Sequence, residues 1–263
     1  ERDAIREGIV ALYRDVDQAI VELTALRNEV RELAMRWKSL QPAPAVSPSL
    51  APRFTGAAPA LRADHLNASS HIEKGWSLIA LGDYENAERS LLTAMQLAPG
   101  DAQCESLLGW AQMLQEKYDE AMLSFQRVLA REPNNALARV NVGYICLKKR
   151  IFGEAIEHLS RVLRLDSDRK ASLYAHFYMG LVYLHREMYE DAEAFFRRSL
   201  QLGPNLIEAH FELGRALWFS GRREEAARAW RTGADANKFN PWGRRCAEML
   251  KHVEGGGEPP RSS

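Results

Sequence analysis

The sequence predicts an all-α protein in which repeated helical hairpins follow a long heptad helix. Three features of the 263 residues indicate this. Small residues recur at a nearly constant interval from about residue 64 onward, large apolar residues alternate at spacings of four and three over residues 1–41, and prolines gather between these two parts. A fixed interval of this length is typical of repeat proteins, and a 3.5-residue apolar period is typical of a coiled coil.

Residues 1–41 are predicted to form a coiled-coil oligomerisation helix. The apolar series keeps one seam facing a partner helix, with mostly β-branched residues at the a positions and mostly Leu at d, which favours a parallel dimer. Apolar residues also fall at e, which leaves a trimer open, and an amphipathic helix that packs on its own domain is the alternative. The residues expected to carry oligomerisation are Ile9, Leu12, Val16, Leu23, Leu26, Val30, Leu33 and Trp37.

Residues 42–63 are predicted to be a Pro/Ala-rich linker. They hold five prolines, and proline lacks the backbone N–H and biases the residue before it away from helix. No two of these prolines have PxxP spacing, so a plain linker is favoured over a recognition motif.

The remaining chain repeats itself five times. Glycines are separated by 34, 34, 37 and 34 residues, and an alanine follows each glycine after 12 residues. An aromatic residue stands three before four of the alanines, and a large apolar residue stands four after all five. The small residues mark where the two helices of one hairpin approach each other. The glycines are Gly75, Gly109, Gly143, Gly180 and Gly214, and the alanines are Ala87, Ala121, Ala155, Ala192 and Ala226.

This pattern resembles the tetratricopeptide repeat (TPR) family, whose unit is a 34-residue helix–turn–helix. The resemblance implies a right-handed TPR α-solenoid over residues 64–253. The five units are expected at 68–101, 102–135, 136–169, 173–206 and 207–240, with a capping helix at 241–253. Three residues, 170–172, fall between units three and four, and the fifth unit has Arg223 in place of the aromatic. Residues 254–263 are low in apolar content and are predicted to be a disordered tail.

In this family, the first helix of each unit lines a concave groove at positions 2, 5, 9, 12 and 13 of the unit. Carried over to this chain, these positions are unusually apolar, and an apolar patch of this kind marks a binding site. The resemblance therefore implies a peptide-binding groove formed by Ile72, Trp76, Ile79, Trp110, Met113, Tyr144, Leu147, Phe177, Leu181, Phe211, Arg215 and Trp218.

Two alternatives to an open groove remain. Tight superhelical packing would bury many of these side chains between neighbouring first helices, including some of the residues at positions 12 and 13. The groove could also be filled in cis, by the 42–63 linker or by the partner chain. If the groove is open, its apolar lining suits an apolar or amphipathic segment, such as a helix docked by one face.

Composition excludes several function classes. Lys plus Arg and Asp plus Glu both total 35, so the net charge is zero, which argues against nucleic acid as a partner. No apolar run is long enough to span a membrane. Three scattered cysteines indicate buried free thiols. No nucleophile–base, phosphate-loop or metal-ligand motif occurs, so we expect no enzyme activity, no cofactor and no metal.

We therefore predict a non-catalytic scaffold or adaptor that binds a protein partner in the TPR groove and forms a homo-oligomer through the coiled coil. Alternatives are a bacterial envelope-assembly or secretion chaperone or pilot protein, and a regulatory fragment of a larger enzyme. We expect a cytoplasmic location, with a periplasmic or membrane-tethered form if a signal or anchor precedes residue 1.

Overall fold

A computed structural model describes residues 65–261 of the chain, and helices are its only regular elements in that range. The predicted heptad helix, with its oligomerisation residues, and the predicted linker lie outside the described residues. The helices are α2 (His65–Ala80), α3 (Tyr84–Leu97), α4 (Ala102–Leu114), α5 (Tyr118–Arg131), α6 (Ala136–Lys148), α7 (Phe152–Leu165), α8 (Arg169–His185), α9 (Tyr189–Leu202), α10 (Ile207–Phe219), α11 (Arg223–Ala236) and α12 (Pro241–Glu254).

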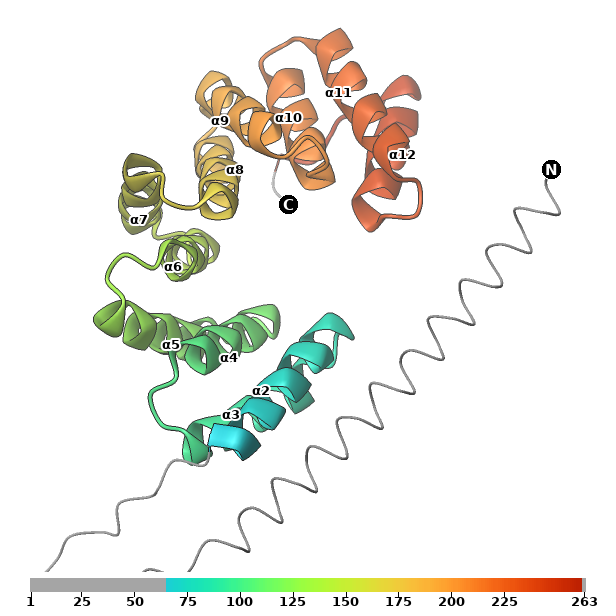
Figure 1. Cartoon of the computed structure of the whole chain (residues 1–263). Coiled ribbons are helices and arrows are strands. Elements are labelled where there is room, and N and C mark those ends of the chain that lie inside the picture. Colours follow the sequence, from blue (N-terminus) through green and yellow to red (C-terminus); the bar gives the residue numbers. More distant parts are fainter. Residues whose placement is uncertain (1–64, 262–263) are drawn as a thin grey trace, which may run out of the picture. The chain divides into compact units, whose positions relative to one another are not determined.

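These helices form five hairpins, each made of a first helix, called A, and a second helix, called B. Within each hairpin A packs on B, and B packs on the A helix of the next hairpin. Consecutive A helices also contact one another, whereas consecutive B helices in the described part of the chain do not pack together, although an ion pair between Arg197 and Glu225 bridges α9 and α11. The hairpins therefore follow a curved path, with α2, α4, α6, α8 and α10 on its inner side (Figure 1).

The repeated glycine of each A helix lies against the large apolar residue of its own B helix. A Cβ atom added at Gly214 would lie 2.2 Å from Nε1 of Trp230, and one at Gly180 would lie 2.5 Å from the ring of Phe196. Both aromatic side chains are fully buried, as are the five repeated alanines. The close approach of A and B that the small residues predict is therefore present, and these contacts form the hydrophobic core between the two helix layers.

The turn between A and B has one geometry in all five hairpins. The residue two before each B helix has a positive φ, and the next residue donates its N–H to the carbonyl five residues earlier, as in Lys117 N–H to Gln112 O at 3.0 Å. Glycine takes the left-handed position in the first and last turns, whereas Glu116, Arg150 and Glu187 take it in the others. Such a turn closes the A helix by satisfying its last carbonyls.

Each B helix then begins at the residue that the repeat pattern makes aromatic, from Tyr84 in α3 onward. In the fifth hairpin Arg223 takes this place, and its guanidinium lies 4.9 Å from the ring centroid of Trp218. A cation–π contact thus replaces aromatic packing at the last turn.

The structure shows where the irregular fourth unit absorbs its extra residues. Helix α8 begins at Arg169, so residues 170–172 form its first turn and lengthen it to 17 residues. Asp168 caps the helix by accepting a hydrogen bond from the N–H of Ala171 at 2.7 Å. Asp101 and Asn135 cap α4 and α6 in the same way. The sequence places the start of this unit at residue 173, because the repeat pattern does not register an added helical turn.

Helix α12 covers the open side of the last hairpin. The side chain of Asn240 caps it, Pro241 is its first residue, and Cys246 is fully buried against α11 and α10. Trp242, Met249, Leu250 and Val253 pack on the same cluster.

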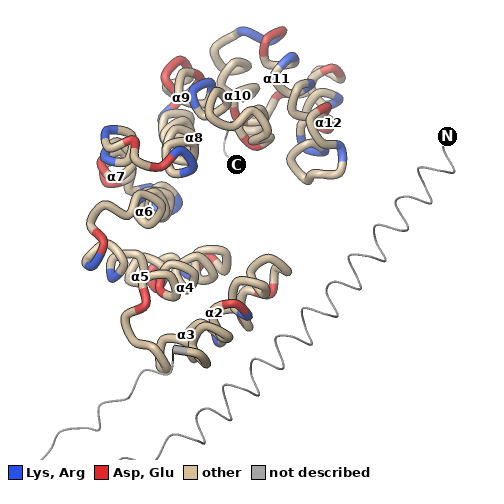
Figure 2. Tube along the Cα trace, viewed as in Figure 1, with Lys and Arg blue, Asp and Glu red and all other residues tan. Residues whose placement is uncertain are grey.

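Charged residues lie mostly at turns and on outer helices, while the inner helices are largely uncharged (Figure 2). Within residues 65–261, no helix has both the length and the apolar character needed to cross a membrane.

Candidate functional site

The candidate site is the inner surface that the A helices build. Positions 5, 9 and 12 of a unit, counted from residues 68, 102, 136, 173 and 207, are four and three residues apart and share one face of a helix. Position 8 is the repeated glycine that faces the B helix. The inner face therefore consists of three parallel columns of side chains, one for each position, running from α2 to α10.

Two of the three columns contribute mainly to the core. At position 12, Ile79, Met113 and Leu147 are buried, and Trp218 is half-buried. At position 5, Phe177 and Phe211 are buried, whereas Ile72 is half-buried. Neighbouring A helices cover these side chains, which is the tight superhelical packing that the sequence left as an alternative. Five of the predicted groove residues are thus core residues.

The position-9 column remains at least partly open in the first four hairpins. Trp76 is 52% exposed, and Trp110, Tyr144 and Leu181 are half-buried. The rings of Trp76 and Trp110 lie 5.6 Å apart between centroids and tilt by 44°, so two consecutive hairpins share one aromatic surface. Of the three columns, position 9 lies farthest around the helix from the glycine that faces B, and neighbouring A helices cover its side chains only in part.

The middle of the column is extended by an aromatic residue that the repeat positions do not pick out. Tyr178 stands at position 6 of the fourth unit, and its ring centroid lies 4.8 Å from that of Tyr144. Burial raises the pKa of Tyr144 to about 12 and also raises that of Tyr178. Both phenols therefore stay neutral at physiological pH, which keeps this part of the surface uncharged.

The last member of the column is charged and buried. Arg215 is 1% exposed, and its Nη1 donates to Oε2 of Glu212 at 2.7 Å. Glu212 is also buried, and this burial raises the pKa of its carboxyl, against the opposing effect of Arg215. The remaining donors of Arg215 point to the segment after α12, where the Nη2 group lies 2.9 Å from the carbonyl oxygen of Pro260.

That segment differs from the disordered tail predicted over 254–263. Residues 254–261 are described by the structure, and Pro259 is buried. Little in the sequence signals this contact, since a Gly- and Pro-rich end usually has too few apolar groups to order itself. Arg215 is a clue in retrospect, because position 9 holds Trp, Trp, Tyr and Leu in the other four units.

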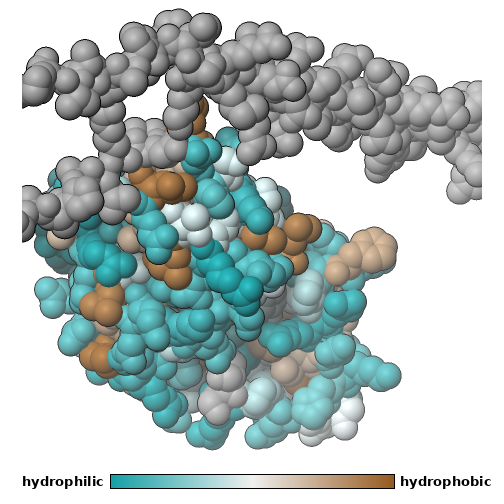
Figure 3. All heavy atoms as spheres, turned by 90° about the horizontal axis from the view of Figure 1, so that it is seen from below, coloured by the Kyte–Doolittle hydropathy of each residue, from teal (hydrophilic) through white to brown (hydrophobic). Residues whose placement is uncertain are grey.

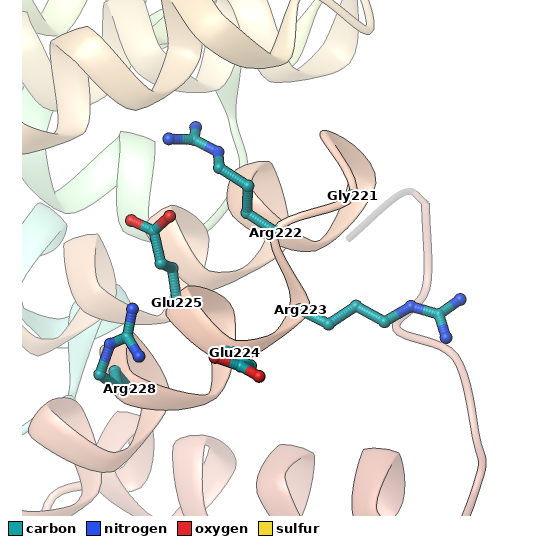
Figure 4. A pocket seen from close by; sticks show the side chains of 6 residues that line it. All are labelled: Gly221, Arg222, Arg223, Glu224, Glu225 and Arg228. Carbon is teal, nitrogen blue, oxygen red and sulfur yellow. The ribbon is translucent and has the colours of Figure 1, made fainter.

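The described residues also contain surface depressions and buried cysteines away from the position-9 column. Two polar depressions lie away from the position-9 column: one on α2 and α3, and one at the turn into α11, where Arg222 and Arg223 point to opposite sides (Figure 4). Arg222 there forms an ion pair with Glu193. All three cysteines are buried, and burial raises their thiol pKa values to about 12, 11 and 12 for Cys104, Cys146 and Cys246. No cluster of metal-ligating side chains occurs within residues 65–261.

A stack of helical hairpins with an open inner column is the architecture of α-solenoid repeat proteins. Sequence models of the tetratricopeptide repeat match residues 72–129, 106–170, 173–206 and 207–232. The chain belongs to the tetratricopeptide repeat family, as the sequence pattern predicted. Proteins of this family are generally protein-interaction scaffolds and are typically not enzymes.

Two curated relatives show how far the similarity extends. The chain is 25% identical over 164 residues to the tetratricopeptide repeat-containing protein trd-1 of Caenorhabditis elegans, covering 62% of this chain and 19% of that protein. It is 29% identical over 76 residues to the photosystem I assembly protein Ycf3 of Acaryochloris marina, covering 29% of this chain and 46% of that protein. The chain thus spans less than half the length of either relative.

Solved structures of TPR proteins share the fold. A thermophilic TPR protein of Thermus thermophilus, TTC0263, superposes with a TM-score of 0.62 at 20% identity, covering 70% of this chain and 99% of that chain. Pseudomonas aeruginosa pilF superposes with a TM-score of 0.59 at 20% identity, covering 72% of this chain and 86% of that chain. At this identity the similarity establishes the fold alone.

Proposed function

We propose that this chain is a non-catalytic adaptor that binds an apolar or amphipathic segment of a protein partner along the position-9 column. The observation that carries the proposal is the shared aromatic surface of Trp76 and Trp110, which is partly open on the inner side while the columns beside it are mostly buried. Tryptophan and tyrosine are the residues most enriched at the centres of protein interfaces.

The electrostatics of the inner face support an apolar ligand. The A helices contain few charged residues (Figure 2), and the neutral phenols of Tyr144 and Tyr178 continue the apolar path beyond Trp110. A helix would present side chains at i, i+3, i+4 and i+7 to such a path. Within residues 65–261, the other exposed apolar residues, such as those among polar side chains at the α2–α3 end (Figure 3), form no comparable column.

The proposal is tested by selecting binders from a displayed library of amphipathic helical peptides against the full chain. A selected peptide is then labelled, and its affinity is measured by fluorescence anisotropy. The double variant Trp76→Ala with Trp110→Ala should weaken binding at least tenfold, since interface aromatics of this kind contribute about 2 kcal/mol or more. Leu123→Ala is the matched control, because Leu123 is an apolar side chain on α5, 56% exposed, away from the inner face.

Equal loss of affinity in the control and in the double variant would contradict the proposal, and so would unchanged affinity in the double variant. A thermal melt of each variant separates loss of binding from loss of fold. Trp76 is half exposed, so its truncation removes little core packing.

Oligomerisation through residues 1–41 is part of the same proposal, because two copies on one stalk would gain avidity for a multivalent partner. The heptad pattern supports it. Leu23→Asp with Leu26→Asp in the full chain should reduce the mass measured by light scattering to that of a monomer. A monomeric mass for the unaltered chain would remove this part of the proposal.

A second candidate function is that of an assembly chaperone, favoured by the similarity to a photosystem I assembly protein. In that role the column would shield an apolar segment of a client until the client is assembled. The selected peptide fused to an aggregating carrier would then stay in solution in the presence of the chain. Unchanged aggregation, measured as light scattering, would count against this role while leaving the adaptor proposal intact.

A further inference from the structure

The chain reverses direction after α12 and returns to the inner side of α10. Gly255, Gly256 and Gly257 form the reversal, with a φ of 86° at Gly256 that suits glycine. The N–H of Gly257 donates to the carbonyl of His252 at 3.0 Å, and a ring nitrogen of His252 lies 3.1 Å from the carbonyl oxygen of Glu258. The last turn of α12 therefore holds the start of the tail and sets its direction.

The side chain of Arg215 binds main-chain carbonyls at the end of this tail. Its Nε and Nη2 groups lie 3.2 and 2.9 Å from the carbonyl oxygen of Pro260, and Nη2 lies 2.8 Å from the carbonyl oxygen of Arg261. Three of the four hydrogen bonds of this guanidinium thus go to main-chain carbonyls of the tail. The planar fork of arginine suits such paired acceptors.

A second buried residue of α10 holds the guanidinium of Arg215. Glu212 and Arg215 are three residues apart on α10 and form a buried ion pair, so the carboxylate fixes the guanidinium by its Nη1 group. A buried guanidinium is costly unless its donors are satisfied, and in this structure the tail satisfies Nε and Nη2. Pro259, the residue before the clamped carbonyls, is buried.

The side chain of Arg261 adds a second contact. Its guanidinium lies 5.7 Å from the ring centroid of Phe219, which is at position 13 of the fifth unit and stacks on Tyr189 at 5.5 Å. The carboxylate of Glu187 lies 3.9 Å from the same guanidinium. An aromatic pair and an acid therefore face the cation that follows the two prolines.

We propose that this end of the inner surface is a recognition site for an extended Pro-Pro-Arg segment, and that the chain's own residues 258–261 occupy it as a built-in ligand. Prolines hold a segment extended and present its carbonyls at a low entropic cost. The Glu212–Arg215 pair would bind two main-chain carbonyls of the segment, and Phe219 and Glu187 would contact its arginine side chain.

This site is chemically distinct from the apolar column at Trp76 and Trp110, and it closes the column at α10. A tethered ligand has a high effective concentration, so the tail should exclude a competing peptide of the same type. A partner carrying a stronger Pro-Pro-Arg segment would have to displace the tail to bind.

The test uses a fluorescein-labelled synthetic peptide with the sequence of residues 257–263, GEPPRSS, and measures anisotropy. The open form of the protein is the full chain with Pro259→Gly, Pro260→Gly and Arg261→Ser, which keeps the length and α12 but removes the two prolines that hold the tail extended and the arginine side chain that contacts Phe219. This triple variant should bind the peptide, and the unaltered chain should bind it at least tenfold more weakly. Glu258→Ala is the control, because only the main chain of Glu258 makes a contact that the structure shows.

Arg215→Lys in the open form should lose at least tenfold in affinity, since lysine keeps the charge beside Glu212 but lacks the fork. If this variant melts at a lower temperature than its parent, the peptide is changed in place of the protein. Replacing both prolines of the peptide by glycine should also weaken its binding to the open form at least tenfold. Equal binding to the open form and the unaltered chain would overturn the proposal, and so would a failure of the open form to bind. Neither result depends on Trp76 or Trp110. A failure of this proposal would therefore not count against the adaptor proposal, which its own experiment tests.

Discussion

The glycine of the fifth hairpin gives the sharpest test of how the repeat is held together. In Gly214→Ala the new Cβ would lie 2.2 Å from Nε1 of Trp230, which is fully buried and donates to the carbonyl of Phe211 at 2.9 Å. The indole therefore has no room to retreat without losing that bond. Overpacking of this kind costs about 3 kcal/mol at the upper end of the usual range.

The gain in helix propensity from Gly to Ala is about 1 kcal/mol and offsets part of this cost. We expect Gly214→Ala to lower the free energy of unfolding by about 2 kcal/mol. In Gly109→Ala the nearest atom, Cζ of Phe125, lies at 3.0 Å, so the ring needs to move by only a few tenths of an ångström. The cost and the gain then cancel to within about 1 kcal/mol.

Gly153→Ala is the matched control, because this glycine is in α7 and a Cβ there meets nothing within 4 Å. This variant should be slightly stabilised. Urea unfolding followed by circular dichroism at 222 nm gives all three free energies. The slope with urea also reports whether the end of the solenoid unfolds separately, because repeat proteins are coupled mainly between neighbours. Equal stability of Gly214→Ala and Gly109→Ala would refute the reasoning.

Three further predictions follow from local features. Glu116 has a φ of 60°, a left-handed conformation that costs free energy in residues other than glycine. Glu116→Gly should therefore raise the free energy of unfolding, measured with denaturant, by up to about 1 kcal/mol. No gain in this free energy would show that the turn imposes no strain. Burial lowers the pKa of His176, so the unfolded state binds a proton at a higher pH than the folded state does, and stability falls as the pH drops below the ordinary value of 6.5. His176→Phe should therefore reduce the slope of melting temperature against pH below 6.5. An unchanged slope would show that His176 is not a cause of the pH dependence. The three buried cysteines should react with a thiol reagent at pH 7.5 only after unfolding, because burial raises their pKa, and rapid labelling of the native chain would contradict their placement.

The repeat architecture could be predicted from the sequence because each unit restates the same local constraint. A small residue on one helix must face a large one on the next, and the five pairs from Gly75 with Leu91 to Gly214 with Trp230 satisfy that constraint at a constant spacing. Turn residues such as Glu116 break the usual preference for glycine, yet the hairpin forms because its packing outweighs the local cost.

The candidate site could be predicted only in part. Whether a position on the inner face is open or buried depends on how it is oriented toward the neighbouring A helix. Position 12 is turned toward that helix and position 9 is turned partly away from it. This orientation depends on the superhelical packing of successive units, which the sequence of one unit does not encode. The contact between Arg215 and the tail spans 45 residues of sequence, and nothing in the composition of GGGEPPRSS distinguishes a docked end from a solvated one.

The position of a bound peptide on the solenoid tests the central proposal most directly. A selected amphipathic peptide that carries a photo-reactive benzoylphenylalanine on its apolar face can be cross-linked to the full chain and mapped by mass spectrometry. The proposal predicts cross-links on α2, α4 and α6, near Trp76, Trp110 and Tyr144. Cross-links confined to α3, α5 and α7 would show that the outer helices bind the ligand and would contradict it.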